Sequence, residues 1–79
     1  MTEIPLSQIQ EGQTVQVASL LATGSMRRRL LDIGLVEGTA VTCLQRSPSG
    51  DPVAYGIRGS VIALRREDSS QVLVDSWQE

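Results

Sequence analysis

The sequence predicts a mainly β fold, a small antiparallel barrel of five or six strands with one short inserted helix. Three observations support this prediction. Short segments alternate between apolar and polar residues, which is the period of a strand. Clusters of Gly, Pro, Ser and Asp separate these segments, as turns do. Only one stretch of the 79 residues repeats its apolar positions with the spacing of a helix.

Five segments are predicted to be strands because apolar side chains alternate along them. In chain order, they are residues 14–20, 39–46, 53–58, 61–65 and 71–75. In the first strand, Val15 and Val17, with Ser19, are expected to share one side. The residues from Ile4 are expected to begin extended, followed by one helical turn that Ser7 caps. Gly59-Ser60 is predicted to be a tight hairpin turn, and residues 67–70 a single helical turn.

Residues 26–33 are predicted to form the one inserted helix. Met26, Leu30 and Ile33 recur at i, i+4 and i+7, which makes one apolar stripe. We expect this stripe to face the core, with Leu30 and Ile33 largely buried. Ser25 is the predicted N-cap. Gly34 suits the left-handed conformation that ends many helices.

Composition indicates one domain in a reducing compartment. The length fits a single domain, residues 1–79 with a core of about 4–75, and 41% apolar residues argue against disorder. The single cysteine, Cys43, cannot form an internal disulfide, whereas small extracellular domains usually need several. No secretory leader and no apolar run of about 20 residues is evident. We therefore predict a cytoplasmic protein.

The sequence offers no pattern typical of catalysis or metal binding. Histidine is absent, and one cysteine with scattered carboxylates falls short of the four Cys or His ligands of structural zinc. Glu67-Asp68 is the only adjacent carboxylate pair, and a helical-turn cap explains it equally well. Cys43 fits the alternation of an apolar strand, which predicts a buried, inert thiol. We therefore expect no catalytic residue, no cofactor and no metal site.

The most unusual charged feature is the run Arg27–Arg29 at the start of the predicted helix. The positive pole of the helix dipole disfavours cations there. One interpretation is that Arg27, Arg28 and Arg29 anchor acidic side chains of a protein partner. The alternative is pairing within the chain, either between Arg28 and Asp32 at i+4 or with Asp51 or Glu67 reaching over.

The loop of residues 47–52 is a second candidate contact. Pro48, Asp51 and Pro52 make it stiff and exposed, and stiff loops lose little entropy on binding. The alternative is that the loop only joins two strands.

The two aromatic residues bear on the class of partner. Tyr55 alternates with Val53 and Ile57, so we predict a place in the core or barrel wall, the alternative being a binding hot spot. Trp77 is expected either to close the barrel end or to stand exposed. So few aromatic residues, with a net charge of −2, argue against nucleic acid as a partner.

An ordered set of short motifs resembles the FeoA family, the ferrous iron transport proteins A. The residues that carry the resemblance are Leu6-Ser7, Gly12, the run from Met26 to Leu35, Gly38-Thr39, the run from Ser47 to Pro52, Ile57-Arg58-Gly59 and Ala63-Leu64-Arg65. The resemblance covers roughly Ile4 to Val74. It implies an SH3-like barrel that serves bacterial ferrous iron uptake in the cytoplasm.

The resemblance also implies a partner, the membrane iron transporter FeoB with its GTPase domain. We therefore expect an adaptor or regulator that acts by protein–protein contact and reaches the membrane only through this partner. The alternative is a stand-alone SH3-like module that binds a peptide or a repressor and is unrelated to transport.

Overall fold

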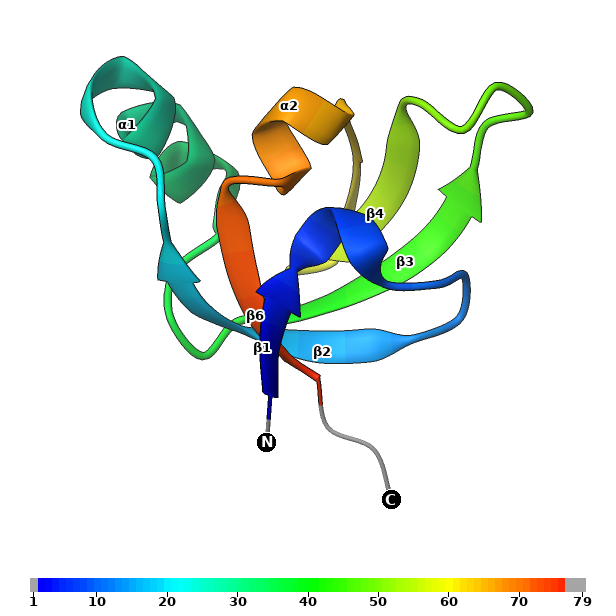
Figure 1. Ribbon diagram of the computed structural model, residues 1–79, viewed down its shortest axis with the longest axis horizontal. Helices are drawn as coiled ribbons and strands as arrows, with labels where there is room; N and C mark the ends of the chain where they lie inside the picture. The colour runs from blue at the N-terminus through cyan, green and yellow to red at the C-terminus, as the bar shows by residue number, and fades with distance from the viewer. Residues whose placement is uncertain (1, 77–79) are drawn as a thin grey trace.

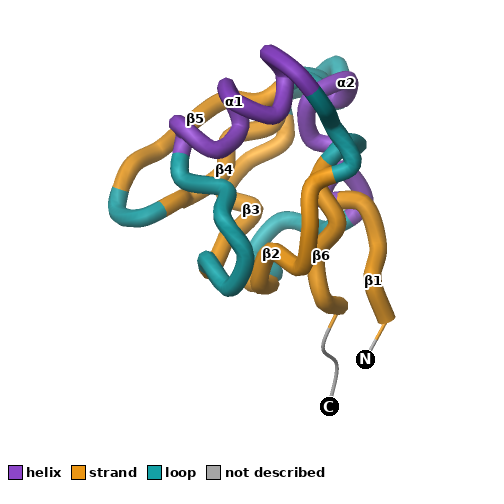
Figure 2. The backbone as a smooth tube through the Cα atoms, turned by 90° about the vertical axis from the view of Figure 1, so that its left-hand side faces the viewer, coloured by secondary structure: helices purple, strands orange, loops and turns teal. Residues whose placement is uncertain are grey.

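Six strands form one antiparallel sheet that curls around the core (Figure 1). The computed structural model describes residues 2–76. The strands are β1 (Thr2–Pro5), β2 (Thr14–Leu20), β3 (Ala40–Arg46), β4 (Val53–Ile57), β5 (Ser60–Leu64) and β6 (Val72–Ser76). Their order in the sheet is β1-β6-β2-β3-β4-β5, which can be followed from right to left in Figure 2. The predicted mainly β, barrel-like fold is confirmed, although β1 and β5 remain sheet edges.

Strand β1 is the element that the alternation of the sequence did not predict as a strand. It pairs with β6, with Glu3 opposite Asp75 and Ile4 opposite Val74. Four residues that end in a proline are too few to display a period. Because Pro5 donates no backbone hydrogen bond, it is tolerated at such an edge.

In β2, the buried side chains follow the predicted alternation as far as a bulge. Val15 and Val17 of β2 are buried as predicted. Ser19, expected on the same side, is exposed because the register with β6 shifts between Val17 and Ser19. One extra residue in a strand reverses the facing of those that follow. Leu20 therefore packs against the core in place of Ser19.

Helix α1 spans Gly24–Ile33 and begins two residues earlier than predicted. Its N-cap is Thr23, without a side-chain capping bond, so the prediction of Ser25 was wrong. Leu30 is fully buried as expected, whereas Met26 and Ile33 are only half-buried at the margin of the core. The helix therefore packs on the barrel chiefly through Leu30, with Met26 and Ile33 in contact with the edge of the core.

The end of α1 matches the prediction. Gly34 has a φ of 113°. The N–H of Leu35 donates to the carbonyl of Leu30 at 3.1 Å, and that of Gly34 donates to Leu31 at 3.0 Å. This is the Schellman pattern, and it folds the fully buried Leu35 back beneath the helix.

The hairpin turn between β4 and β5 consists of Arg58 and Gly59, because Ile57 pairs with Ser60. This is one residue before the predicted Gly59-Ser60. Arg58 and Gly59 have φ values of 53° and 83°, as expected for the two-residue turn that suits the twist of a hairpin.

Two short helical turns complete the described chain. The 3-10 helix η1 spans Leu6–Gln8 after an N-cap at Pro5, so Ser7 is not its cap. Helix α2 spans Arg66–Ser69, one residue before the predicted turn. None of the helices within residues 2–76 is long and apolar enough to cross a membrane. Trp77 lies outside the described residues.

Candidate functional site

The three consecutive arginines of α1 point in different directions because each residue turns the helix by about 100°. Arg29 lies nearest the buried stripe on the side of α2. Its Nη2 is 3.0 Å from Oδ2 of Asp68, and its Nη1 donates to Oδ1 at 3.3 Å. The Asp68 side chain is only 4% exposed, whereas that of Arg29 is 57% exposed. Arg29 therefore serves the fold, because it neutralises a buried carboxylate and ties α1 to α2.

Arg27 and Arg28 make no ion pair and no side-chain hydrogen bond within the described residues. The one ion pair of residues 2–76 is Arg29–Asp68. The predicted alternative of a pair between Arg28 and Asp32 is therefore wrong. The carboxylate that reaches the arginine run is Asp68, and neither Asp51 nor Glu67 forms an ion pair with it. Two guanidinium groups are left free for a partner.

Two adjoining hollows flank Arg27 and Leu31, which lie one helical turn apart. The outer hollow, of about 380 Å³, is lined by Gly24, Arg27, Arg28, Leu31 and Asp32. The other, of about 330 Å³, lies between α1 and β2, and we call it the α1–β2 groove. Its lining residues are Val17, Ala18, Ser19, Leu20, Arg27, Leu31, Leu35 and Glu37. Leu31 is thus an apolar ridge between two concave surfaces.

Exposed apolar side chains gather around the same helix. Five large hydrophobic residues are exposed in the described chain, and three of them lie on α1 or on the segments beside it. These are Leu21 at 54%, Leu31 at 36% and Val36 at 38% exposure. Exposed apolar residues beside free charges are typical of protein-binding surfaces.

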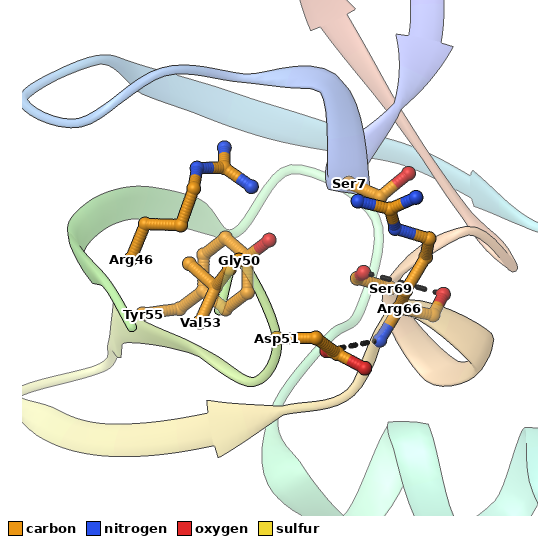
Figure 3. Close-up of a pocket in the computed structure, with 8 residues that line it drawn as sticks. All are labelled: Ser7, Arg46, Gly50, Asp51, Val53, Tyr55, Arg66 and Ser69. Carbon is orange, nitrogen blue, oxygen red and sulfur yellow. Dashed lines mark hydrogen bonds between the residues drawn. The ribbon is translucent and has the colours of Figure 1, made fainter. Parts of the chain in front are cut away.

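The predicted loop of residues 47–52 has its polar groups paired internally. Oδ1 of Asp51 accepts a hydrogen bond of 2.9 Å from the N–H of Arg66, at the start of α2 (Figure 3). The hydroxyl of Ser49 donates to the carbonyl of Asp51 at 3.0 Å. Asp51 and Pro52 are half-buried, whereas Pro48 is exposed. The Asp51 carboxylate therefore holds α2 in place.

The structure does not bring the two predicted contact segments together. In Figure 1, the loop that contains Pro48, Asp51 and Pro52 lies at the upper right, α1 at the upper left, and α2 between them. Arg27 and Arg28 therefore form a surface separate from that of the loop.

The interior shows no activated nucleophile among the described residues. Burial raises the pKa of the Cys43 thiol, an effect that outweighs the opposing charge of Arg46. Burial likewise raises the pKa of the Tyr55 phenol. Tyr55 is fully buried, as predicted, and its hydroxyl donates to the carbonyl of Leu6 at 3.5 Å. No group of three or more Cys, Asp or Glu residues within residues 2–76 is arranged to hold a metal ion. The prediction that no metal site exists remains to be tested.

Comparison with known proteins places the chain in a family. The FeoA domain family matches residues 4–76, nearly the whole sequence. The chain belongs to the FeoA family. This family is linked to ferrous iron transport, and its members are small SH3-like accessory domains.

One curated relative joins this kind of domain to a transporter. It is the Fe(2+) transport protein A/Fe(2+) transporter FeoB fusion protein of Porphyromonas gingivalis, 34% identical over 70 residues. The match covers 89% of this chain but only 8% of the relative. FeoA and FeoB sequences therefore occur within a single polypeptide in that organism.

Two solved structures of the family have the same fold. The FeoA-like protein of Clostridium acetobutylicum is 31% identical and superposes with a TM-score of 0.91, covering 100% of this chain and 93% of the other. The FeoA of Stenotrophomonas maltophilia, complexed with zinc and described as an SH3 domain protein, is 28% identical. It superposes with a TM-score of 0.80 and covers 89% of this chain and 87% of the other.

Sequence reasoning found the free arginines but missed the apolar half of this surface. The signal was present in Leu31, which lies about 100° from Leu30 and so falls off the buried stripe. Grouped with the exposed Leu21 and Val36, an apolar residue on the solvent side of the helix favours a binding surface. The residues of β2 that line the groove gave no comparable signal, because the bulge between Val17 and Ser19 has no mark in the sequence.

Proposed function

We propose that this protein is a non-catalytic accessory of ferrous iron uptake that binds a FeoB-type membrane transporter through the outer surface of α1. The observation that carries the proposal is the fusion of FeoA and FeoB in the Porphyromonas gingivalis relative. Fusion keeps two domains at a high effective concentration. Separate chains of the same kinds need an interface of their own to remain associated.

The chemistry of the α1 surface supports this location for the interface. Arg27 and Arg28 have no partner among the described residues, and Leu31 lies beside them, between the outer hollow and the α1–β2 groove. An exposed aliphatic side chain bordered by free guanidinium groups fits a partner that offers acidic side chains around an apolar one. Arg29 is not included in this interface because its guanidinium group is already paired with Asp68.

The proposal places the protein in the cytoplasm, at the membrane only through the transporter, and without a nucleic-acid partner. The single unpaired Cys43 supports a cytoplasmic location, and so does the GTPase domain that the partner is expected to present there.

Charge reversal at α1 tests the proposal. Arg27→Glu with Arg28→Glu should leave the fold intact, because exposed charges usually shift stability by less than about 0.5 kcal/mol. It should weaken binding to the detergent-solubilised FeoB-type transporter of the same genome. The loss should be greater at about 0.01 M than at about 0.15 M salt, because screening shortens the range of the charges.

Arg65→Glu provides the matched control. Arg65 is also exposed, but it lies at the start of α2 and lines neither hollow. The proposal expects parental binding from this variant. Parental binding by the double variant, or equal losses in the double variant and the control, would contradict docking through α1.

A further inference from the structure

Strand β2 has partners on both sides only in its middle, at Gln16 and Val17. Its pairing with β3 ends at Gln16 opposite Ala40. Val17 adds two more hydrogen bonds on this side: its N–H donates to Thr39 at 2.9 Å, and its carbonyl accepts from Gly38 at 2.8 Å. On the other side, the pairing with β6 continues to Leu20 opposite Val72. From Ala18 to Leu20, one edge of β2 therefore has no neighbouring strand.

The free backbone groups of this edge face the α1–β2 groove. The N–H of Leu21 donates to Gln71 at 2.7 Å, so Leu21 points toward the β6 side. Backbone groups of successive residues alternate between the two sides of an antiparallel strand. The N–H and carbonyl of Leu20 consequently point away from β6, toward the α1–β2 groove that Arg27 and Leu31 line. An unpaired edge of this kind is a template for another strand.

The walls of the groove indicate what kind of segment fits. Arg27 lies near the end of β2, since only residues 21–23 separate that strand from α1. Glu37 lies at the opposite end, next to Gly38, which donates to Val17. Leu31 and Leu35 supply apolar wall between the two charges. The groove is therefore positive at one end, apolar in the middle and negative at the other end.

We propose that the α1–β2 groove receives an extended peptide segment of the transporter, which pairs as an added strand with β2 at Ala18–Leu20. The segment carries an acidic side chain that reaches Arg27 and, two residues along and therefore on the same face of the strand, an apolar side chain that packs on Leu31. Its residue beside Glu37 is not acidic, so the two charges fix the direction in which the segment lies. This inference rests on the proposed function and adds to it the mode of binding.

Single charge reversals separate the groove from a general electrostatic contact. Arg27 lines both hollows, whereas Arg28 lines only the outer one. With the solubilised transporter as the ligand, Arg27→Glu should weaken binding about tenfold or more, and Arg28→Glu by less than about threefold. Glu37→Gln should leave affinity unchanged or raise it. A larger loss in Arg28→Glu than in Arg27→Glu overturns the proposal.

Amide hydrogen exchange, resolved to single residues, tests strand addition directly. Addition of the transporter should slow exchange of the Leu20 amide about tenfold or more, because a hydrogen bond then protects it. The Leu21 amide, already bonded to Gln71, serves as the internal control and should change much less. If the transporter binds but the Leu20 amide exchanges as in the free protein, docking through α1 stands and strand addition is wrong. Protection of Leu20 without transporter, at a concentration where sedimentation shows a dimer, identifies a second copy as the occupant and also overturns the proposal.

Discussion

Helix α1 and the loop of residues 47–52 were both predicted contact surfaces, but they differ in whether their polar side chains are paired within the domain. In the loop, the Asp51 carboxylate accepts from the backbone of α2 and Ser49 donates back into the loop. On α1, Arg27 and Arg28 have no partner within the described residues, and Leu31 is exposed between two hollows. Polar residues that are satisfied inside the domain hold its shape, whereas unsatisfied ones remain available to another molecule.

The same contrast recurs within the arginine run. Arg29 is committed to the buried Asp68, while its neighbours are free. Identical side chains at successive positions thus take different roles, because the helix turns each toward a different neighbour. The following predictions test the division between the residues that hold the fold and those that face outward.

The largest expected effect separates Leu30 from Leu31. Leu30 is fully buried beneath α1, so Leu30→Ala should lower the free energy of unfolding by about 2–5 kcal/mol. Leu31→Ala should cost less than about 1 kcal/mol, because its side chain is partly in water already. Urea denaturation measures both. Similar losses in the two variants would show that the assignment of the buried and outer faces of α1 is wrong.

Substitutions of Arg29 and Arg28 should likewise differ in their effect on the free energy of unfolding. Arg29→Ala should lower the free energy of unfolding by about 1–2 kcal/mol, since it removes the two charge-assisted bonds to Asp68. The value is moderate because the Arg29 side chain is itself more than half exposed. Arg28→Ala is the matched control, with an expected change below about 0.5 kcal/mol. Equal stability of the two variants in denaturation experiments would remove the structural role given to Arg29.

A substitution in the loop of residues 47–52 should change the stability of the domain and leave its affinity for the transporter unchanged. Asp51→Ala removes the acceptor for the N–H of Arg66 and should cost about 1 kcal/mol, as the loss of a helix N-cap does. Its affinity for the transporter should equal that of the parent, measured by the same assay as for the α1 variants. A weakened complex with unchanged stability would instead restore the loop as a contact surface.

The smallest expected effect is that of adding metal ions to the domain. The domain has no histidine and a single, buried cysteine, so ferrous or zinc ions should not bind the monomer at micromolar concentration. Anaerobic calorimetry, with sedimentation to report the oligomeric state, makes the measurement. Stoichiometric micromolar binding to the monomer would contradict the prediction. The Stenotrophomonas maltophilia structure, in contrast, is a complex with zinc.

The features predicted correctly from the sequence depend on local periods. Alternation identified β4, in which Val53, Tyr55 and Ile57 are all buried. The preference of glycine for the left-handed conformation identified the end of α1 at Gly34. The features that were missed depend on distant partners. Asp68 lies 39 residues from Arg29, so no local pattern connects the two. The bulge in β2, which exposes Ser19, arises from pairing with β6.

Backbone amide NMR of the isotope-labelled protein, titrated with the solubilised transporter, maps the contact most directly. A chain of 79 residues gives a resolved amide spectrum in the free state, and residues at a binding surface are the first to shift or broaden. If α1 is the docking surface, the changes should concentrate on residues 18–37, while the amides of residues 47–52 keep their free-state positions. Changes centred on residues 47–52, with those of Arg27, Arg28 and Leu31 unaffected, would contradict it.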